Sequence, residues 1–154
     1  MIFEVINAAA EAYRGVIPAD CWHEPYMSRA ELTDEISAGV EFSVLEVDGV
    51  VAAVMGMQHT VEVMLVRHAY TAPTHQGKGL GSQLLAHVRA QTAMPVLIGT
   101  WAAAAWAVRF YETHGFRVVG ASEKDRLLKQ YWTVPERQIE TSVVLVDERW
   151  DSRG

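Results

Sequence analysis

The chain has 154 residues, of which half are hydrophobic and 21% are charged. This composition fits one folded domain and excludes a disordered chain, which would combine low hydrophobicity with high net charge. The formal charge of −6, without any run of basic residues, argues against a nucleic-acid-binding protein, because phosphate affinity depends on clustered Lys and Arg. The single cysteine, Cys21, excludes an internal disulfide and a cysteine zinc site, and it fits a reducing compartment.

No apolar stretch reaches the length of about 18 residues that a membrane-spanning helix needs. The first residues include Glu4 and Glu11 and carry no basic flank, so they do not resemble a signal peptide. We therefore expect a cytoplasmic protein of one domain, residues 1–154, that binds neither membranes nor nucleic acid.

The first expected elements are two helices joined by a loop. Residues 3–14 are rich in alanine and have apolar residues at helical spacing, which predicts a helix. Residues 17–27 predict a loop. Ser28 and Glu31 have the spacing of a capping box and predict the start of a second helix, which Gly39 ends.

Three strands are expected next. Residues 42–47 and 50–57 are rich in β-branched and apolar side chains and flank Asp48-Gly49, a dipeptide typical of tight hairpins. Residues 61–71 predict a third strand. A glycine-rich loop and an amphipathic helix over residues 80–93 follow it.

The rest of the chain alternates between strands and helices. We expect a strand at 95–100, a helix at 103–114, a strand at 116–119, a helix at 122–131 and a last strand at 138–146. Antiparallel strands followed by this alternation predict an α+β fold with a mixed sheet. The apolar last strand is a candidate edge for pairing two copies into a homodimer.

The most informative motif is Gln76-Gly77-Lys78-Gly79-Leu80-Gly81, at the junction of the third strand and the helix after it. Glycine permits positive φ and lets a ligand approach the backbone, and the first turn of a helix offers free N–H groups. The spacing matches neither a nucleotide P-loop nor a dinucleotide-binding fingerprint. It predicts a site for a phosphate or diphosphate.

This Gln-x-x-Gly-x-Gly pattern resembles the acyl-CoA diphosphate loop of the GNAT superfamily of N-acetyltransferases. A second segment, Ala107-Val108-Arg109-Phe110-Tyr111-Glu112-Thr113-His114-Gly115-Phe116, is similar to the Ala-x-x-Phe-Tyr-x-x-x-Gly-Phe segment of that family. The resemblance covers residues 40–119 well and both ends poorly. It implies a mixed, mostly antiparallel central sheet flanked by helices, which could lack the family's first edge strand.

The resemblance also implies that acetyl-CoA is the co-substrate and that no metal is needed. The histidines show no metal-ligand spacing. In the family's layout, the pantetheine arm runs along the strand before the glycine loop, and the loop holds the diphosphate. The cofactor-binding residues expected here are Ala69, Tyr70, Thr71, Gln76, Gly77, Lys78, Gly79, Leu80, Gly81 and Ser82.

Tyr111 is the expected general acid. When an amine attacks a thioester, a thiolate leaves, and a phenol within reach can protonate it. In relatives with this Phe-Tyr pair, the tyrosine is placed to do so. A buried aromatic at helical spacing beside Phe110 is the alternative role for Tyr111.

The general base is harder to assign. The two positions that usually carry it in the family hold Leu65 and Arg67, and neither side chain can accept a proton. Glu62 and His68, which lies one position out of phase, remain weak base candidates. His23 and Glu24, on the loop after the first helix, are further candidates. A water relay, or an acceptor that arrives already neutral, is an alternative to a side-chain base.

The acceptor pocket is expected to be partly aromatic. Arg67 would point toward the acceptor and pair with an anionic group, unless it forms a salt bridge to Glu62 or a neighbouring strand. The expected substrate-binding residues are Arg67, Trp22, His23 and Trp101, with Tyr26, Tyr131 and Trp132 nearby. An asparagine that commonly contacts pantetheine in the family is replaced by Ala104.

The expected function is N-acetyl transfer from acetyl-CoA to the primary amine of a small acceptor by direct attack, and an acceptor with an anionic group is one alternative. The alternative is a non-catalytic acyl-CoA-binding regulatory module that keeps the diphosphate loop and lacks the base. The two differ in whether any amine is acetylated.

Overall fold

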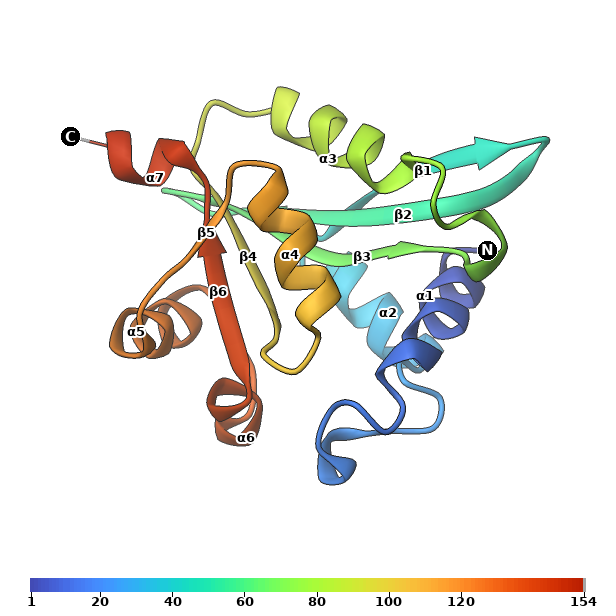
Figure 1. Cartoon of the computed structure of the whole chain (residues 1–154), viewed down its shortest axis with the longest axis horizontal. Coiled ribbons are helices and arrows are strands. Elements are labelled where there is room, and N and C mark those ends of the chain that lie inside the picture. Colours follow the sequence, from blue (N-terminus) through green and yellow to red (C-terminus); the bar gives the residue numbers. More distant parts are fainter. Residues whose placement is uncertain (154) are drawn as a thin grey trace.

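The computed structural model describes residues 1–153, and its centre is a six-stranded sheet in the order β1-β2-β3-β4-β6-β5 (Figure 1). β3 and β4 are parallel, and every other neighbouring pair is antiparallel. The strands are β1 (Glu41–Val47), β2 (Val50–His59), β3 (Met64–Thr71), β4 (Val96–Trp101), β5 (Arg117–Val118) and β6 (Ser142–Val146). The predicted α+β fold with a mixed, mostly antiparallel sheet is confirmed.

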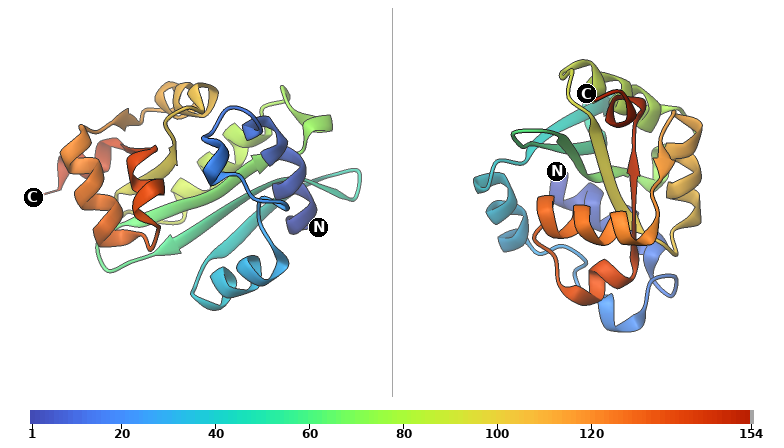
Figure 2. Two further views of the ribbon diagram at one scale, coloured as in Figure 1. Left: turned by 90° about the horizontal axis from the view of Figure 1, so that it is seen from below. Right: turned by 90° about the vertical axis from the view of Figure 1, so that its left-hand side faces the viewer.

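Helices cover both faces of the sheet. α3 and α4 pack on one face, and α1, α2, α5 and α6 pack on the other (Figures 1 and 2). The helices are α1 (Ile2–Ala10), α2 (Arg29–Ser37), α3 (Leu80–Ala90), α4 (Ala105–Thr113), α5 (Ala121–Tyr131), α6 (Glu136–Glu140) and α7 (Glu148–Ser152). No helix in the described residues is both long and apolar enough to cross a bilayer.

Local signals account for the first part of the sheet. Asp48 and Gly49 both have positive φ, of 53° and 80°, as a tight hairpin turn between β1 and β2 requires. The Ser28 side chain accepts from the Glu31 N–H, and Glu31 reaches back to the backbone of Ser28, so the predicted capping box is present. Within residues 1–153, no strand precedes α1, and β1 forms one edge of the sheet.

The end of the chain differs from the prediction for residues 138–146. Glu136–Glu140 form the helix α6. Pro135 is a residue that favours a helix start, and the negative charge of Glu136 in the first turn is stabilised by the positive end of the helix dipole. Only Ser142–Val146 form the strand. β6 lies between β4 and β5, so the last strand is not an edge of the sheet, and the expectation that it is one was wrong.

A β-bulge interrupts the pairing of β2 with β3. Met55 of β2 lies opposite both His68 and Ala69 of β3, and His68 has a φ of 56°. A Cβ on Gly56 would lie 2.8 Å from the carbonyl oxygen of Arg67, so glycine is the residue that fits opposite the bulge. The positive φ of His68 lowers the free energy of unfolding by on the order of 1–3 kcal/mol, and contacts of the surrounding structure must offset this loss.

β3 and β4 pair over only three residues each, and then the two strands diverge (Figure 1). Val66 and Ile98 form the last pair. Beyond them, the backbone of β3 from residue 67 to residue 71 pairs with β2 and has no pairing with β4. The sheet therefore contains an unpaired strand edge in its interior, beside α4.

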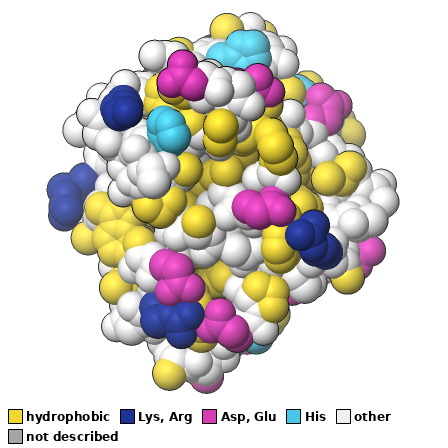
Figure 3. Space-filling view, turned by 90° about the vertical axis from the view of Figure 1, so that its right-hand side faces the viewer, with side chains coloured by type: hydrophobic (Ala, Val, Ile, Leu, Met, Phe, Trp, Pro, Cys, Tyr) yellow, Lys and Arg dark blue, Asp and Glu magenta, His cyan; other side chains and the backbone are white. Residues whose placement is uncertain are grey.

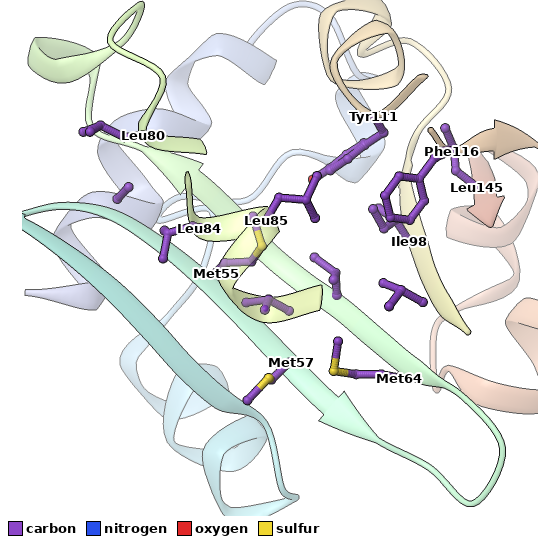
Figure 4. Packing of buried hydrophobic residues seen from close by; sticks show 14 of the residues in the cluster. Met55, Met57, Met64, Leu80, Leu84, Leu85, Ile98, Tyr111, Phe116 and Leu145 are labelled. Carbon is purple, nitrogen blue, oxygen red and sulfur yellow. The ribbon is translucent and has the colours of Figure 1, made fainter. Parts of the chain in front are cut away.

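The largest core cluster lies between this sheet and α3 and α4. Figure 4 shows Tyr111 reaching from α4 across the sheet, beside Leu85 of α3 and close to Ile98 of β4. Tyr111 is only 6% exposed. The core thus fixes the position of the tyrosine at the point where β3 and β4 separate.

A buried aspartate joins the far end of the sheet to α3 and α7. Asp147 is 1% exposed, and its carboxylate accepts from the backbone N–H groups of Val96 and Arg149, at 3.2 and 3.1 Å. Arg89 of α3 donates to the same carboxylate at 3.3 Å. This network connects three elements that the chain brings together from distant positions.

Candidate active site

The first cavity lies where the glycine loop meets α1, α4 and the end of β3, and it has a volume of about 410 Å³. Gly77 and Gly79 have φ values of 79° and 77°, which L side chains rarely adopt, and a Cβ at either position would point into open space. Gly79 caps α3 without any side-chain hydrogen bond. The first N–H groups of α3 thus remain available, which suits an anion such as a diphosphate.

Gly81 adds a second constraint. Its ideal Cβ would lie 3.3 Å from the Phe110 ring, so the start of α3 and the middle of α4 are packed as closely as glycine allows. Figure 3 views the end of the molecule that carries the glycine loop and shows apolar side chains gathered in its centre, with charged side chains scattered around them.

A histidine that the sequence analysis did not identify supports this loop. His114 Nδ1 lies 2.7 Å from the Phe110 carbonyl oxygen, which can only accept, so Nδ1 carries a proton. His114 Nε2 lies 2.9 Å from Ser82 Oγ, at the wall of the first cavity. The signal was available, since His114 is within the second motif, but only the fold shows its partner.

The second cavity, of about 120 Å³, extends between β3 and β4 toward α5 and α6. Its walls are largely aromatic and include Tyr26, Trp101 and Trp132, and the Trp101 indole donates to the Tyr26 hydroxyl at 2.7 Å. The two cavities share five lining residues: Tyr13, Ala69, Tyr70, Ala107 and Tyr111. They therefore meet at the point where the strands diverge.

The phenols around this meeting point are held in their neutral form. Burial raises the pKa of Tyr111, and the neighbouring Tyr13 raises it further. Burial also raises the pKa of Tyr26 to about 12 and the pKa values of Tyr13 and Tyr70 above the usual range. At neutral pH these hydroxyls can donate hydrogen bonds, and they cannot act as bases.

Arg67 and His68 line the second cavity and both contact Glu35 of α2, a residue that the sequence analysis did not identify. Arg67 donates to Glu35 at 2.8 Å and to Gln58 at 3.1 Å, and His68 Nε2 pairs with the other oxygen of Glu35. Burial alone would raise the pKa of the Glu35 carboxyl, but the hydrogen bond from His68 and the charges of His68 and Arg67 hold that pKa below its usual value.

The bulge explains why His68 is here. Simple strand alternation would place His68 on the face opposite Arg67, which is how the sequence analysis described it. The extra residue shifts the phase, so Arg67 and His68 both contact α2.

The structure brings most of the expected cofactor-binding residues to the first cavity: Ala69, Tyr70, Thr71, Gln76, Gly77, Gly79, Leu80, Gly81 and Ser82. Lys78 is exposed and is not part of the lining. Of the expected substrate residues, Arg67 and Trp101 line the second cavity, as do Tyr26 and Trp132.

Four other expected residues lie outside both cavities: Trp22, His23, Glu62 and Tyr131. Trp22 stacks under Arg14 and donates to Glu24 at 3.1 Å, and His23 is exposed. Glu62 is in the turn before β3, where its carboxylate accepts from the Tyr131 hydroxyl at 2.5 Å. Among residues 1–153, no cluster of three or more His, Cys, Asp or Glu side chains could hold a metal ion.

Residues 7–129 match the family described as the acetyltransferase (GNAT) domain, and the chain belongs to this family. No curated protein sequence matches the chain. Solved structures resemble it at low sequence identity, which establishes the shared fold.

Several of these structures were solved with a coenzyme. PaiA N-acetyltransferase from Thermoplasma acidophilum, in complex with coenzyme A, has a TM-score of 0.69 and 15% identity, covering 95% of this chain and 89% of its own. A GNAT family acetyltransferase from Elizabethkingia anophelis with acetyl-CoA bound has a TM-score of 0.60 and 21% identity. The match covers 79% of this chain and 83% of that acetyltransferase.

A third is N-acetylglutamate synthase from Neisseria gonorrhoeae, complexed with coenzyme A and N-acetyl-glutamate. Its TM-score is 0.63 and its identity 21%, over 95% of this chain. The present chain spans 31% of that synthase.

Proposed function

We propose that this acetyltransferase moves the acetyl group of acetyl-CoA to the primary amine of a small acceptor, by direct attack of the amine on the thioester. The observation that supports this most is the meeting of the two cavities at Tyr111. A thioester in the first cavity and an amine in the second would face each other there, and most of the rate would come from their proximity.

The first cavity has the chemistry that coenzyme A requires. The N–H groups of the glycine loop and the start of α3 would hold the diphosphate. The unpaired edge of β3 at Ala69, Tyr70 and Thr71 would hydrogen-bond the amides of the pantetheine arm, as an added strand does. The volume of about 410 Å³ accommodates the arm.

Tyr111 is proposed as the general acid. Acetyl-CoA supplies the acetyl group and a thiolate leaving group. The Tyr111 phenol remains protonated because burial raises its pKa, so it can donate a hydrogen bond to the departing sulfur. It gives up its proton only as a proton from the attacking amine replaces it.

The second cavity indicates the kind of acceptor. Its volume of about 120 Å³ requires a small molecule, and its aromatic walls favour an apolar or aromatic body. The described residues that line it include no Asp or Glu, so a polyamine would find no carboxylate for a second ammonium group. Arg67 already donates to Glu35 and Gln58. We propose that its guanidinium group also binds a carboxylate of the acceptor.

A non-catalytic acyl-CoA-binding module is the second candidate function. It is favoured by Leu65, which occupies a base position of the family, is fully buried and packs in the core cluster of α5. Such a module would bind coenzyme A in the first cavity and transfer no acetyl group.

The deciding experiment measures thiol release and acetylated product with acetyl-CoA and four probes: phenethylamine, L-phenylalanine, L-glutamate and spermidine. The proposal predicts N-acetyl product, identified by mass spectrometry, from at least one of the first three, and the least from spermidine. Coenzyme A binding without any N-acetyl product would support the binding module instead.

A further inference from the structure

The second cavity contains one side chain that can accept a proton near neutral pH. Its ionisable lining consists of four tyrosines, Arg67 and His68. The tyrosines are held neutral by burial, and a guanidinium does not give up its proton. Imidazole is the side chain type suited to this range.

We propose that His68 is the general base that removes the proton from the ammonium group of the acceptor, and that Glu35 is the residue that positions it. This inference rests on the proposed N-acetyl transfer. It assigns a base to a chain whose family positions for one hold Leu65 and Arg67.

The contact with Glu35 determines which nitrogen of His68 can act. Nε2 lies against the Glu35 carboxylate, and because a carboxylate can only accept, we infer that Nε2 carries the proton of the neutral ring. Nδ1 then holds the free lone pair, and no group in residues 1–153 forms a hydrogen bond with it. A carboxylate behind an imidazole in this way also stabilises the imidazolium that forms when the base takes up a proton.

Two neighbours fix the ring further. Phe42 of β1 stacks on it, with ring centroids 6.2 Å apart and 26° between the planes. The charged groups that face His68 are Glu35 from α2 and the adjacent Arg67 of β3, whose own charge is offset by Glu35. The remaining titratable groups around the cavity are the neutral phenols of Tyr13, Tyr26, Tyr70 and Tyr111.

The bulge is what makes this arrangement available. It turns His68 onto the face of Arg67 at a φ of 56°, a strained conformation for a residue with a side chain. Strained residues cluster at functional sites, and this one lies on the wall of the proposed acceptor site.

The proton balance is complete without another reactant. One N–H bond of the ammonium group breaks, and its proton passes to Nδ1 of His68 and then to solvent. The nitrogen lone pair forms the new C–N bond as the C–S bond breaks. The sulfur takes the proton of Tyr111, which is replaced by the second proton that leaves the nitrogen.

The test uses two acceptors of the same chain length, ethylamine and 2,2,2-trifluoroethylamine, because the second is largely uncharged at neutral pH and needs no base to free its lone pair. The variant is His68→Asn, since asparagine tolerates positive φ and cannot take up the proton. The expected loss in kcat/KM is about 100-fold or more for ethylamine and less than about 5-fold for trifluoroethylamine. The matched control is His87→Asn, an exposed histidine of α3 that lines neither cavity, which should change neither rate.

Glu35→Gln tests the positioning role, because glutamine can still accept from Arg67 and has no charge. We expect kcat/KM to fall about 10-fold for ethylamine and less than about 5-fold for trifluoroethylamine, because a base that is no longer positioned matters only for the charged amine. Asp34→Asn, an exposed change on the same helix, should leave both unchanged.

A measurement without substrate separates the two proposals. Nitrogen-15 spectra of the histidine rings in the free protein should show His68 protonated at Nε2, and Glu35→Gln should alter this signal. Equal losses for both amines in His68→Asn, or a ring protonated at Nδ1, would overturn the base assignment while leaving N-acetyl transfer intact. Failure of the unaltered protein to acetylate any amine would overturn both.

Discussion

Ser82 and His114 join the start of α3 to the end of α4 by a hydrogen bond of 2.9 Å between Ser82 Oγ and His114 Nε2. Because Nδ1 of His114 is committed to the Phe110 carbonyl, a neutral His114 must accept the hydroxyl hydrogen of Ser82. This hydrogen bond fixes Ser82 at the wall of the first cavity, where the anion would bind.

We therefore predict that His114→Asn weakens coenzyme A binding by about 3- to 10-fold, the range for loss of one hydrogen bond. Calorimetry should detect this loss, and His87→Asn, an exposed histidine of α3 that does not line the cavity, is the control. An unchanged affinity of His114→Asn would contradict the supporting role of His114.

Gly79→Ala should weaken coenzyme A binding by at least about 10-fold. The new Cβ would occupy open space in front of the N–H groups, and the φ of 77° would cost on the order of 1–2 kcal/mol of stability. Gly15→Ala is the matched control, because Gly15 has nearly the same φ, 76°, and open surroundings away from both cavities. Thermal unfolding and calorimetry should show similar destabilisation in the two variants and a loss of affinity in Gly79→Ala alone.

Tyr111→Phe should lower kcat by about 10- to 1000-fold while the affinity for acetyl-CoA stays nearly unchanged, as expected for the loss of one positioned acid. The phenyl ring fills the same core position, so the fold should be retained. Tyr131→Phe, which changes a tyrosine outside both cavities, serves as the control. Unaltered turnover of Tyr111→Phe with both substrates saturating would exclude Tyr111 from the mechanism.

The local parts of this structure could be predicted from the sequence, because their causes are local. Asp48-Gly49 and the Ser28–Glu31 capping box define their turns within a few residues, and the glycine loop carries its own backbone requirement. The bulge at His68 could not be predicted, because alternation is the default for a strand and the shift depends on its partner at Gly56.

Glu35 was not identified for a related reason. It lies on a helix with little apolar character, and only the packing of α2 beside the bulge brings it to His68. The expected roles of Trp22 and His23 assumed that the loop after the first helix approaches the acceptor site, and that of Glu62 assumed that the far end of the third strand does. Trp22 instead donates to Glu24, and Glu62 accepts from Tyr131, partners that residue types alone do not reveal.

Glu35 should also contribute to stability in a pH-dependent way. Its folded pKa lies below the ordinary 4.5, so its carboxylate stabilises the fold at neutral pH, and this contribution is lost as pH falls through the folded value. Urea unfolding of Glu35→Gln should show a smaller loss of stability between neutral and acidic pH than the unaltered protein. Parallel curves for the two proteins would contradict the pairing of Glu35 with His68 and Arg67.

Asp147→Asn should destabilise the protein by about 1–2 kcal/mol, because it removes the buried charge that Arg89 and two backbone N–H groups contact, while Arg89 keeps its ion pair with Glu148. Asp151→Asn is the control, since Asp151 is 52% exposed and its ion pair with Arg117 is on the surface. Urea unfolding should separate the two variants, and equal stabilities would show that the Asp147 network does not hold α3, β4 and α7 together.

The most direct test of the account is a crystal structure of the protein with coenzyme A. We expect the diphosphate on the backbone N–H groups of the glycine loop and the start of α3, and the sulfur within about 3.5 Å of the Tyr111 hydroxyl, at the junction of the two cavities. A coenzyme bound elsewhere, or a sulfur that Tyr111 cannot reach, would contradict the proposed acetyl transfer.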